Sequence, residues 1–268
     1  MSALSGKNIL VTGGTGILGR EFVRAISAAH GTAIVLGRNQ SKATELLVEI
    51  KEAGGFAFFL KADVEDIDSL ILARRNLEKD GFILHGLVNA AGGNVPEGIV
   101  PPDRDVFDID LEGVQKAMNL NTMGTINAVQ VFGKMLTGRE GGSIVNISSV
   151  SAQRPLTRVL GYGMGKAALD NYTKWMAVEI AKRYGDRIRI NAIAPGFFLS
   201  KQNEKLLIDE KGNWTSRAES ILQHTPFQRF GKASELTAAL IWLLSDQSSF
   251  VTGMNIGIDG GFTINSGV

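Results

Sequence analysis

Residues 8–19 read NILVTGGTGILG, and this short stretch decides the fold. Its first five residues, Asn8 to Thr12, are mostly apolar and β-branched, which is typical of a buried strand. The segment Gly14-Thr15-Gly16-Ile17-Leu18-Gly19 then matches the GxGxxG pattern at the start of a helical repeat. Glycines permit a tight turn and the close approach of a pyrophosphate, which the free N–H groups and positive dipole end of a helix attract. The stretch therefore predicts a nucleotide-binding turn between a strand and a helix.

The alternation of strand and helix continues along the chain. Further buried strands are expected at residues 32–36, 56–60, 84–89, 142–149, 188–193 and 254–258. Helical patterns lie between them, at residues 17–30, 41–53, about 66–79, 111–137, 160–184 and 233–244, with Ser41 and either Asp66 or Asp68 as N-caps. This order predicts an α/β fold: a single-domain, Rossmann-like, doubly wound parallel sheet of about seven strands with helices on both faces. Residues 197–230 break the alternation and are expected to form a substrate lid within one domain spanning residues 1–268.

The composition excludes several classes of protein. With 268 residues, 44% of them hydrophobic, the chain is long enough for one large α/β domain or two small ones. A net charge of +1 creates no field that would attract nucleic acid or an anionic membrane. Cysteine is absent, so no disulfide, zinc-thiolate site or thiol nucleophile can form, and we expect no metal. Because the sequence shows neither the apolar core of a signal peptide nor a membrane-spanning run, a cytoplasmic protein is expected.

A second informative stretch runs from Gly142 to Tyr184. The apolar run GGSIVNISS ends at Ser149, and Tyr162 and Lys166 open a long helical pattern. Residues four apart share one face of a helix, so both side chains should point toward whatever Ser149 reaches from the strand end. A phenol, an ammonium and a hydroxyl at one point form a proton-transfer site, because the cation stabilises a phenolate. The alternative is a surface tyrosine and lysine on an ordinary amphipathic helix.

The end of the second strand bears on the choice of nucleotide. A carboxylate there usually binds the ribose hydroxyls of NAD, whereas an arginine accommodates the 2′-phosphate of NADP. This chain has Arg38 and Asn39 and no acid, and a guanidinium suits a phosphate, so NADP is favoured over NAD. An Arg38 side chain stacked on the adenine would be compatible with either cofactor. Asp63, at the end of the third strand, is a candidate both for binding the adenine amino group and for capping the next helix.

The order of the motifs resembles the short-chain dehydrogenase/reductase family over essentially the full length of the chain. The matching parts include the turn at residues 12–19, Asp63-Val64, Asn89-Ala90-Ala91-Gly92, Asn121, Ser149, Tyr162 with Lys166, Asn191 and Pro195-Gly196. One departure is the turn itself, which reads TGxxGxxG instead of the TGxxxGxG usual in single-domain members. The resemblance implies an NAD(P)-dependent oxidoreductase that acts on CH–OH donors.

The resemblance also implies roles for particular residues. Tyr162 would be the general acid/base, while Lys166 would favour the phenolate and hold the nicotinamide ribose. Ser149 would orient the substrate oxygen, with Ser148 and Ser151 as rivals. A water linking Lys166 to solvent would be positioned by Asn121, with Asn119 as the competing choice. The implied cofactor-binding residues are Gly13, Thr15, Gly16, Ile17, Leu18, Gly19, Arg38, Asn39, Asp63, Val64, Asn89, Ala90, Ala91, Gly92, Tyr162, Lys166, Pro195, Gly196, Phe198 and Ser200.

Several strings are similar to one group within the family, the D-mannonate oxidoreductases of the short-chain type (fructuronate reductases), which interconvert D-fructuronate and D-mannonate. These strings are NAAGGN, GGSIVNISS, RPLTR, NAIAPGFFLS and HTPFQRFG. A hexuronate carries a carboxylate and hydroxyls, so its pocket should contain a cation and amide side chains. The candidate substrate residues are Asn94, Ser149, Arg154, Arg158, Phe197, Lys201, Gln202 and Asn203. The alternative for the arginines is a surface or subunit-interface charge.

Other functions remain open from the sequence. They are a gluconate dehydrogenase-like enzyme, a 3-oxoacyl carrier reductase, and a non-catalytic nucleotide-sensing protein. Members of the family are mostly homotetramers that pack helices equivalent to residues 111–137 and 160–184 between subunits, so a homo-oligomer is expected. Trp175 and Trp242 fall at core-like helical positions and are expected to pack internally.

Overall fold

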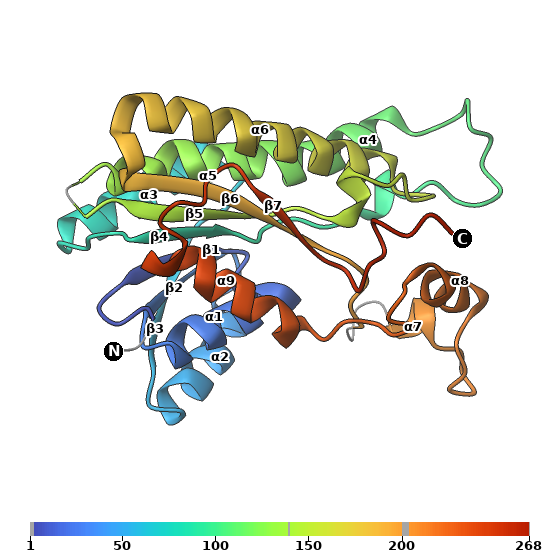
Figure 1. The fold of residues 1–268 in the computed structure, drawn as a ribbon, viewed down its shortest axis with the longest axis horizontal. Helices are drawn as coiled ribbons and strands as arrows, with labels where there is room; N and C mark the ends of the chain where they lie inside the picture. Colours follow the sequence, from blue (N-terminus) through green and yellow to red (C-terminus); the bar gives the residue numbers. More distant parts are fainter. Residues whose placement is uncertain (1–2, 139, 200–203, 268) are drawn as a thin grey trace.

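A computed structural model describes residues 3–138, 140–199 and 204–267 of the chain. Its centre is one parallel sheet with the strand order β3-β2-β1-β4-β5-β6-β7 (Figure 1). The strands are β1 (Asn8–Thr12), β2 (Thr32–Gly37), β3 (Phe56–Lys61), β4 (Gly86–Asn89), β5 (Gly142–Ile147), β6 (Ile188–Pro195) and β7 (Asn255–Ile258). The order reverses between β1 and β4, and open α/β sheets bind ligands at such a point, beyond the carboxyl ends of the strands. The predicted fold class is confirmed.

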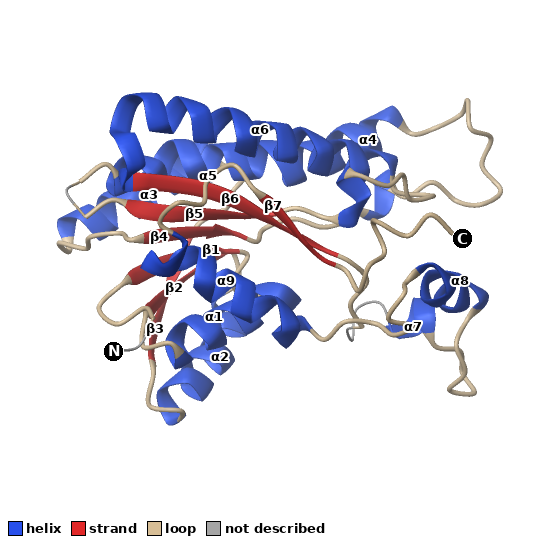
Figure 2. Ribbon diagram, in the orientation of Figure 1, coloured by secondary structure: helices blue, strands red, loops and turns tan. Residues whose placement is uncertain are grey.

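Helices cover both faces of this sheet (Figure 2). One face is covered by α1 (Ile17–Ala28), α2 (Gln40–Glu52) and α9 (Thr237–Leu244). The other is covered by α3 (Ile67–Lys79), α4 (Leu111–Met118), α5 (Gly124–Phe132) and α6 (Leu160–Tyr184). Because a strand turns successive side chains to opposite faces, Val11 joins the core cluster of Phe22, while Leu10 joins that of Phe132. Burial on both faces explains why β1 reads as a continuous apolar run.

Asparagine caps α2 and aspartate caps α3. The predicted N-cap Ser41 is wrong, because the side-chain oxygen of Asn39 accepts from the N–H of Lys42 at 3.2 Å and caps α2. Ser41 lies inside the first turn and donates its hydroxyl to Asn39. Of the two candidates for α3, Asp66 is the cap and Asp68 lies within the helix.

The long helix expected at residues 111–137 is divided. After α4, residues Asn119–Met123 form a wider π-turn, and α5 follows at Gly124. Residues 197–230 contain two short helices, α7 (Glu204–Leu207) and α8 (Ser216–His224), which lie apart from the sheet (Figure 1). A small apolar cluster that includes Leu207, Ile221 and Phe230 holds them together.

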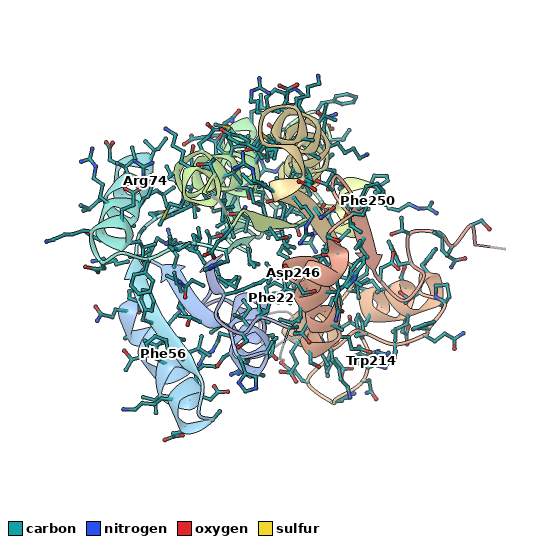
Figure 3. The ribbon with its side chains drawn as sticks, turned by 60° about the vertical axis from the view of Figure 1, so that its left-hand side comes forward. Phe22, Phe56, Arg74, Trp214, Asp246 and Phe250 are labelled. Atoms are coloured by element: carbon teal, nitrogen blue, oxygen red, sulfur yellow. The ribbon has the colours of Figure 1, made fainter. Side chains whose placement is uncertain are left out.

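Some large apolar side chains lie on the surface. Figure 3 shows Phe22 in the interior and Phe250 at the periphery of the molecule. The expectation of internal packing is wrong for Trp175, which is 58% exposed on α6, and for Trp242, which is 36% exposed on α9. An apolar residue at a core-like helical spacing can equally face the flank of a helix that no other element of the chain covers.

Candidate active site

The predicted site residues come together at the carboxyl edge of the sheet. The register aligns Thr12 with Asn89, Asn89 with Asn146 and Asn146 with Ala192. The loops that follow β1, β4, β5 and β6 therefore begin at one level of the sheet. These loops carry the glycine turn, residues 90–94, Ser149 and residues 196–199.

The glycine turn after β1 is too tightly packed for side chains at two positions. Gly13 has a φ of 62°, and an added Cβ would lie 2.7 Å from the Cα of Ala91. An added Cβ at Gly19 would lie 2.1 Å from the carbonyl oxygen of Gly13. Gly16 is the N-cap of α1 and supplies no side-chain acceptor, so the N–H groups of the first turn stay available to an anion. The turn therefore fits a pyrophosphate despite its unusual spacing.

Other predicted cofactor residues lie around this turn. The hydroxyl of Thr12 accepts from the N–H of Ala91 at 3.2 Å, which joins the glycine turn to the loop after β4. Asn89 is buried and donates to Asn146 at 2.9 Å, so it holds β4 against β5 at the base of that loop. Ile17 is partly exposed at the start of α1.

Arg38 and Asp63 lie together at the ends of β2 and β3. The Nη1 of Arg38 is 3.5 Å from Oδ2 of Asp63, and 74% of the Arg38 side chain is exposed. The guanidinium is therefore accessible to a phosphate. The side-chain oxygen of Asn39 is used in capping α2. Asp63 does not cap α3 but accepts from the N–H of Glu65 at 3.1 Å.

Lys166 is buried at the centre of the site, only 4% exposed. Its Nζ donates to the carbonyl oxygen of Ile147 at 2.7 Å and lies 5.6 Å from the centroid of the Tyr162 ring. The loop after β4 comes close as well, since a Cβ added to Gly92 would lie 3.3 Å from Nζ. An ammonium has three donors, and within the described ranges Ile147 is its one acceptor. Two donors thus remain, which fits the hydroxyls of a ribose.

Burial and nearby charges set the acid–base character of this pair. Burial lowers the pKa of Lys166 to about 8, and the negative charge of Asp170 opposes that shift. Burial raises the pKa of the Tyr162 phenol, whereas a hydrogen bond with Ser149 opposes the rise. At neutral pH the lysine is therefore mainly charged, and it can stabilise a phenolate that burial alone disfavours.

The three neighbouring serines have different partners. Ser149 lowers the pKa of the Tyr162 phenol and accepts from the N–H of Ser151 at 3.2 Å. Ser148 donates its hydroxyl to Asp170 instead. The hydroxyl of Ser151 is buried and has no hydrogen-bond partner within the described ranges. Of the three, Ser149 is therefore the serine that the fold places on the phenol.

Asn121 explains the π-turn between α4 and α5. Its side-chain Nδ2 donates to the carbonyl of Ala117 at 2.8 Å, the carbonyl that a regular α-helix would pair with the backbone N–H of Asn121. The same amide donates to the carbonyl of Gly93 and accepts from its N–H, at 2.8 and 2.9 Å. Asn121 is fully buried, whereas the rival Asn119 is exposed. The widened turn thus carries Asn121 onto the loop beside Lys166.

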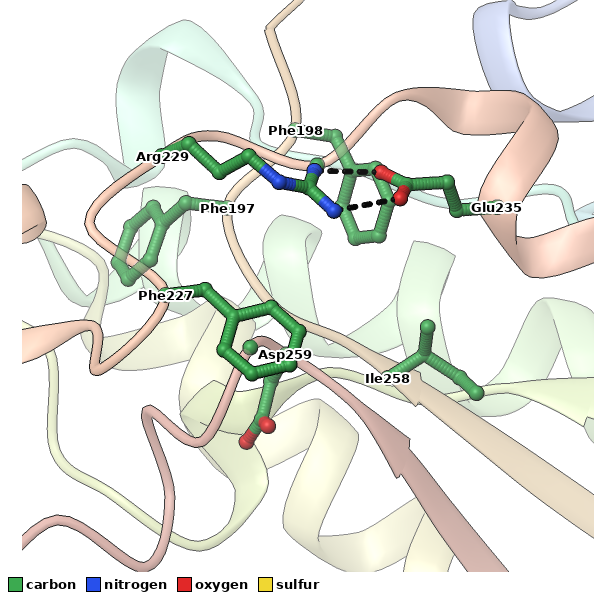
Figure 4. A pocket seen from close by; sticks show the side chains of 9 residues that line it. Phe197, Phe198, Phe227, Arg229, Glu235, Ile258 and Asp259 are labelled. Atoms are coloured by element: carbon green, nitrogen blue, oxygen red, sulfur yellow. Dashed lines mark hydrogen bonds and ion pairs between the residues drawn. The ribbon is translucent and has the colours of Figure 1, made fainter.

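A cavity of about 90 Å³ lies between the end of β6 and residues 227–235 (Figure 4). Phe197 and Phe198, which follow the predicted residues Pro195 and Gly196, line it. Arg229 and Glu235 close one side through two hydrogen bonds of 2.8 and 2.7 Å (Figure 4). The N–H of Gly196 donates to the carbonyl of Ile258 at 3.0 Å, which fixes the start of this loop on β7.

The substrate candidates are more scattered. Arg154 donates through Nε and Nη2 to the carbonyls of Thr263 and Asn265, at 2.8 and 3.0 Å. Arg158 has a positive φ of 73° and donates to the carbonyl of Val100. Asn94 is exposed on the loop after β4. The predicted residues Ser200, Lys201, Gln202 and Asn203 lie outside the described ranges.

Two features of the site could not be recognised from the motifs. Residues 259–267, here called the C-terminal strap, cross the site: Arg154 holds their carbonyls, and Phe262 packs edge-to-face on Phe197 with ring centroids 5.0 Å apart. The second feature is Asp170, which contacts Ser148. Asp170 could have been found from its spacing, because it follows Lys166 by four residues and so lies on the same helical face.

Within residues 3–138, 140–199 and 204–267, none of the helices is both long and apolar enough to cross a membrane. In the same part of the chain, no group of three or more histidine, aspartate or glutamate side chains is arranged to hold a metal ion.

Comparisons with known proteins agree with this geometry. Residues 16–263 match a family model described as enoyl-(acyl carrier protein) reductase. The chain is 40% identical to an uncharacterized oxidoreductase, UxuB, of Bacillus subtilis, over 99% of this chain and 98% of that protein. It is 38% identical, with a TM-score of 0.92, to a "putative D-Mannonate oxidoreductase from Haemophilus influenza" with bound NAD, covering 99% and 98% of the two chains. A gluconate 5-dehydrogenase from Burkholderia cenocepacia, in complex with NADP and tartrate, is 28% identical with a TM-score of 0.86, covering 97% and 96%.

The chain therefore belongs to the short-chain dehydrogenase/reductase family. It is an NAD(P)-dependent oxidoreductase of that family, as the glycine turn and the cluster around Lys166 predict.

Proposed function

We propose that this enzyme transfers a hydride between nicotinamide and the ketone or secondary alcohol of a sugar acid, with D-fructuronate and D-mannonate as the substrate pair. The observation that carries the chemistry is the buried Lys166 beside Tyr162, with Ser149 acting on the same phenol. The support for the substrate is the likeness to the Haemophilus structure described as a D-mannonate oxidoreductase. The described residues also leave charged and amide groups, Arg158 and Asn94, exposed near the site.

We assign the cofactor to the carboxyl edge between β1 and β4. The N-terminus of α1 would hold the pyrophosphate, and the two unused donors of Lys166 would hold the nicotinamide ribose. The bound nicotinamide supplies or accepts the hydride. The chain's own residues supply the proton, the orientation of the substrate and the exclusion of water.

The proton passes through Tyr162. During ketone reduction its phenol gives a proton to the substrate oxygen as the carbonyl carbon gains the hydride, and Tyr162 becomes a phenolate. Lys166 stabilises that phenolate, and Ser149 donates a hydrogen bond that orients the substrate oxygen. Proton resupply to Tyr162 would run through Lys166 and a water beside Asn121. Both amide hydrogens of Asn121 are used, so an oxygen of this residue would hold the water.

The substrate carboxylate needs a cation at the mouth of the pocket. Two of the five N–H groups of Arg154 are used on the C-terminal strap, so Arg154 is a candidate through the three that remain on Nη1 and Nη2. Arg158 and Lys201 are the other candidates, with Gln202 and Asn203 for the hydroxyls. We propose that residues 197–230, including α7 and α8, act as a lid over this mouth within a single domain formed by residues 1–268.

We further propose that NADP is preferred over NAD. The support is the exposed guanidinium of Arg38 and the absence of an acid at the end of β2. Replacing Arg38 with Asp should reverse the preference, measured as kcat/KM with each cofactor. An unchanged preference would remove Arg38 from this role.

A homo-oligomer, such as a tetramer, is proposed for the assembly. The support is the exposure of Trp175 and Val178 on α6, 58% and 53%, since apolar groups of that size are usually covered. Light scattering on the purified protein measures the mass directly, and a monomer would overturn the proposal.

The experiment that tests the function is a substrate panel read at the nicotinamide absorbance band. D-fructuronate, D-mannonate, D-gluconate and simple ketones are each offered with both cofactors. We expect the highest kcat/KM with D-fructuronate and D-mannonate, and a loss of several orders of magnitude in Tyr162→Phe with cofactor binding retained. Preference for D-gluconate would favour the activity of the gluconate 5-dehydrogenase that this chain is similar to. Full activity in Tyr162→Phe would refute the mechanism.

A further inference from the structure

The last residues of β5 and its loop are tied to α6 at successive points. The carbonyl of Ile147 accepts from Lys166 at 2.7 Å, and the hydroxyl of Ser149 faces the phenol of Tyr162 and opposes the rise of its pKa. Tyr162 and Lys166 lie one turn apart on the same helical face. The position of Ser149 relative to the phenol therefore depends on how the end of β5 sits along α6.

Asp170 continues this pattern by one more turn. Its Oδ1 accepts from the hydroxyl of Ser148, the residue between the two ties already described. Its Oδ2 accepts from Nδ2 of Asn255, on β7, at 2.6 Å. Asp170 thus binds the loop after β5 and the last strand of the sheet to the same face of α6.

The charges around Asp170 are few. Lys166 lies one turn before it and Lys174 one turn after it on α6, and both interact with its carboxylate electrostatically. The groups that face it from the loop after β5 and from β7, Ser148 and Asn255, are neutral. Lys166 itself faces the phenol of Tyr162 and the neutral carbonyl of Ile147. Within the described ranges, Asp170 is therefore the carboxylate that acts on Lys166.

We propose that Asp170 is a positioning residue of the proton-transfer site, which fixes Ser149 against Tyr162 through Ser148 and helps to keep Lys166 charged. This inference rests on the proposed roles of Tyr162, Lys166 and Ser149. Asp170 itself touches neither the phenol nor the ammonium through a hydrogen bond, so it acts through its neighbours. Its interaction with Asn255 links the same site to β7, whose following residues form the C-terminal strap.

The sign of the electrostatic effect follows from the burial of Lys166. Burial already brings the pKa of this lysine down to about 8, and the charge of Asp170 opposes the shift. Removing the carboxylate charge lowers the pKa of Lys166 further, so the cation is lost at a lower pH. The alkaline fall of kcat in ketone reduction therefore moves toward lower pH, because Tyr162 loses the cation that stabilises its phenolate.

The test compares Asp170→Asn with Ser148→Ala in ketone reduction, using D-fructuronate and NADPH across pH 6 to 10. Asp170→Asn should lower kcat at least tenfold. It should also lower the alkaline midpoint, the pH at which kcat has fallen to half of its maximum on the alkaline side, by about one pH unit. Ser148→Ala removes the hydrogen bond but keeps the charge, so it should lower kcat roughly tenfold and leave the midpoint in place. The matched control is Asp186→Asn, an exposed carboxylate just beyond α6, which should change neither quantity.

Each outcome decides the proposal. A wild-type kcat in Ser148→Ala, or a midpoint in Asp170→Asn equal to that of the wild type, would overturn it. If Asp170→Asn does not fold, the kcat of Ser148→Ala still supports or overturns the positioning role. Failure of the wild type to reduce D-fructuronate would refute the proposed substrate, and the same variants would then be compared with whichever ketone of the panel the wild type reduces.

Discussion

Replacing Asn121 with Ala should destabilise the enzyme more than the same replacement of Asn127, the asparagine of the following helix α5. The side chain of Asn121 satisfies three backbone groups: the carbonyl of Ala117 and both the N–H and the carbonyl of Gly93. Alanine leaves all three without that partner. Asn127, within α5, offers a matched control because its side-chain amide donates to one carbonyl, that of Val64, at 3.0 Å.

The two replacements should therefore lower the free energy of unfolding by different amounts. Loss of a hydrogen-bond partner costs about 1–3 kcal/mol of unfolding free energy where the remaining group is buried. The loss costs about 1 kcal/mol where water can take the place of the partner. Ala117 is buried, whereas Gly93 is half-buried and open to water. The Asn121→Ala change should therefore lower the free energy of unfolding by about 3 kcal/mol, against about 1 kcal/mol for Asn127→Ala.

Urea unfolding at one fixed protein concentration measures both changes, because any oligomer would make the midpoint depend on concentration. With a slope of about 3 kcal/mol/M, the midpoint should fall by about 1 M for Asn121→Ala and by about 0.3 M for Asn127→Ala. Equal shifts in the two variants would show that the π-turn does not depend on the three contacts of Asn121, and would refute this reasoning.

Three further changes have distinct readouts. Gly19→Ala should abolish cofactor binding or folding, seen by nicotinamide fluorescence and circular dichroism, because its Cβ would overlap the carbonyl of Gly13 at 2.1 Å; tight cofactor binding in that variant would contradict the described turn. Arg154→Ala should raise the KM for the sugar acid about tenfold while the cofactor Kd stays constant, since the C-terminal strap loses its anchor; an unchanged KM would separate the strap from the substrate pocket. Arg229 brings the pKa of Glu235 down to about 2, so the stability that this pair contributes is full above about pH 4.3 and is lost as the pH falls toward 2. The midpoint temperature of thermal unfolding should accordingly fall less steeply from pH 6 to pH 3 in Arg229→Ala than in the wild type. Parallel curves of midpoint against pH would refute the assignment.

The sequence was informative where the physics is local. Apolar runs at regular spacing predict the strands, because a strand covered on both faces has no polar side. The spacing of Tyr162 and Lys166 predicts one helical face, and the structure brings both to Ser149. The glycine turn is local as well, since Gly13 and Gly19 contact each other within one short segment.

The parts that could not be predicted depend on contacts between distant residues or on a choice between similar groups. Asn39 and Ser41 are both good capping residues, and only the backbone path of the turn favours the first. The contact of Arg154 with the strap joins residues 109 positions apart, which no local pattern encodes. The exposure of Trp175 could not be predicted either, because a helix shows which residues share a side but not which sides are covered.

The strand order also bears on how the protein folds during synthesis. β1 lies in the middle of the sheet, yet its partners β2 and β4 are made at different times. A nascent polypeptide can pair β1 with β2, and β2 with β3, while the other edge of β1 waits for residues 86–89. That edge belongs to a strand whose Ile9, Leu10 and Val11 are fully buried in the native fold, and an unpaired apolar edge recruits strands from other molecules. The interval before β4 arrives is therefore a stage at which this protein is exposed to aggregation.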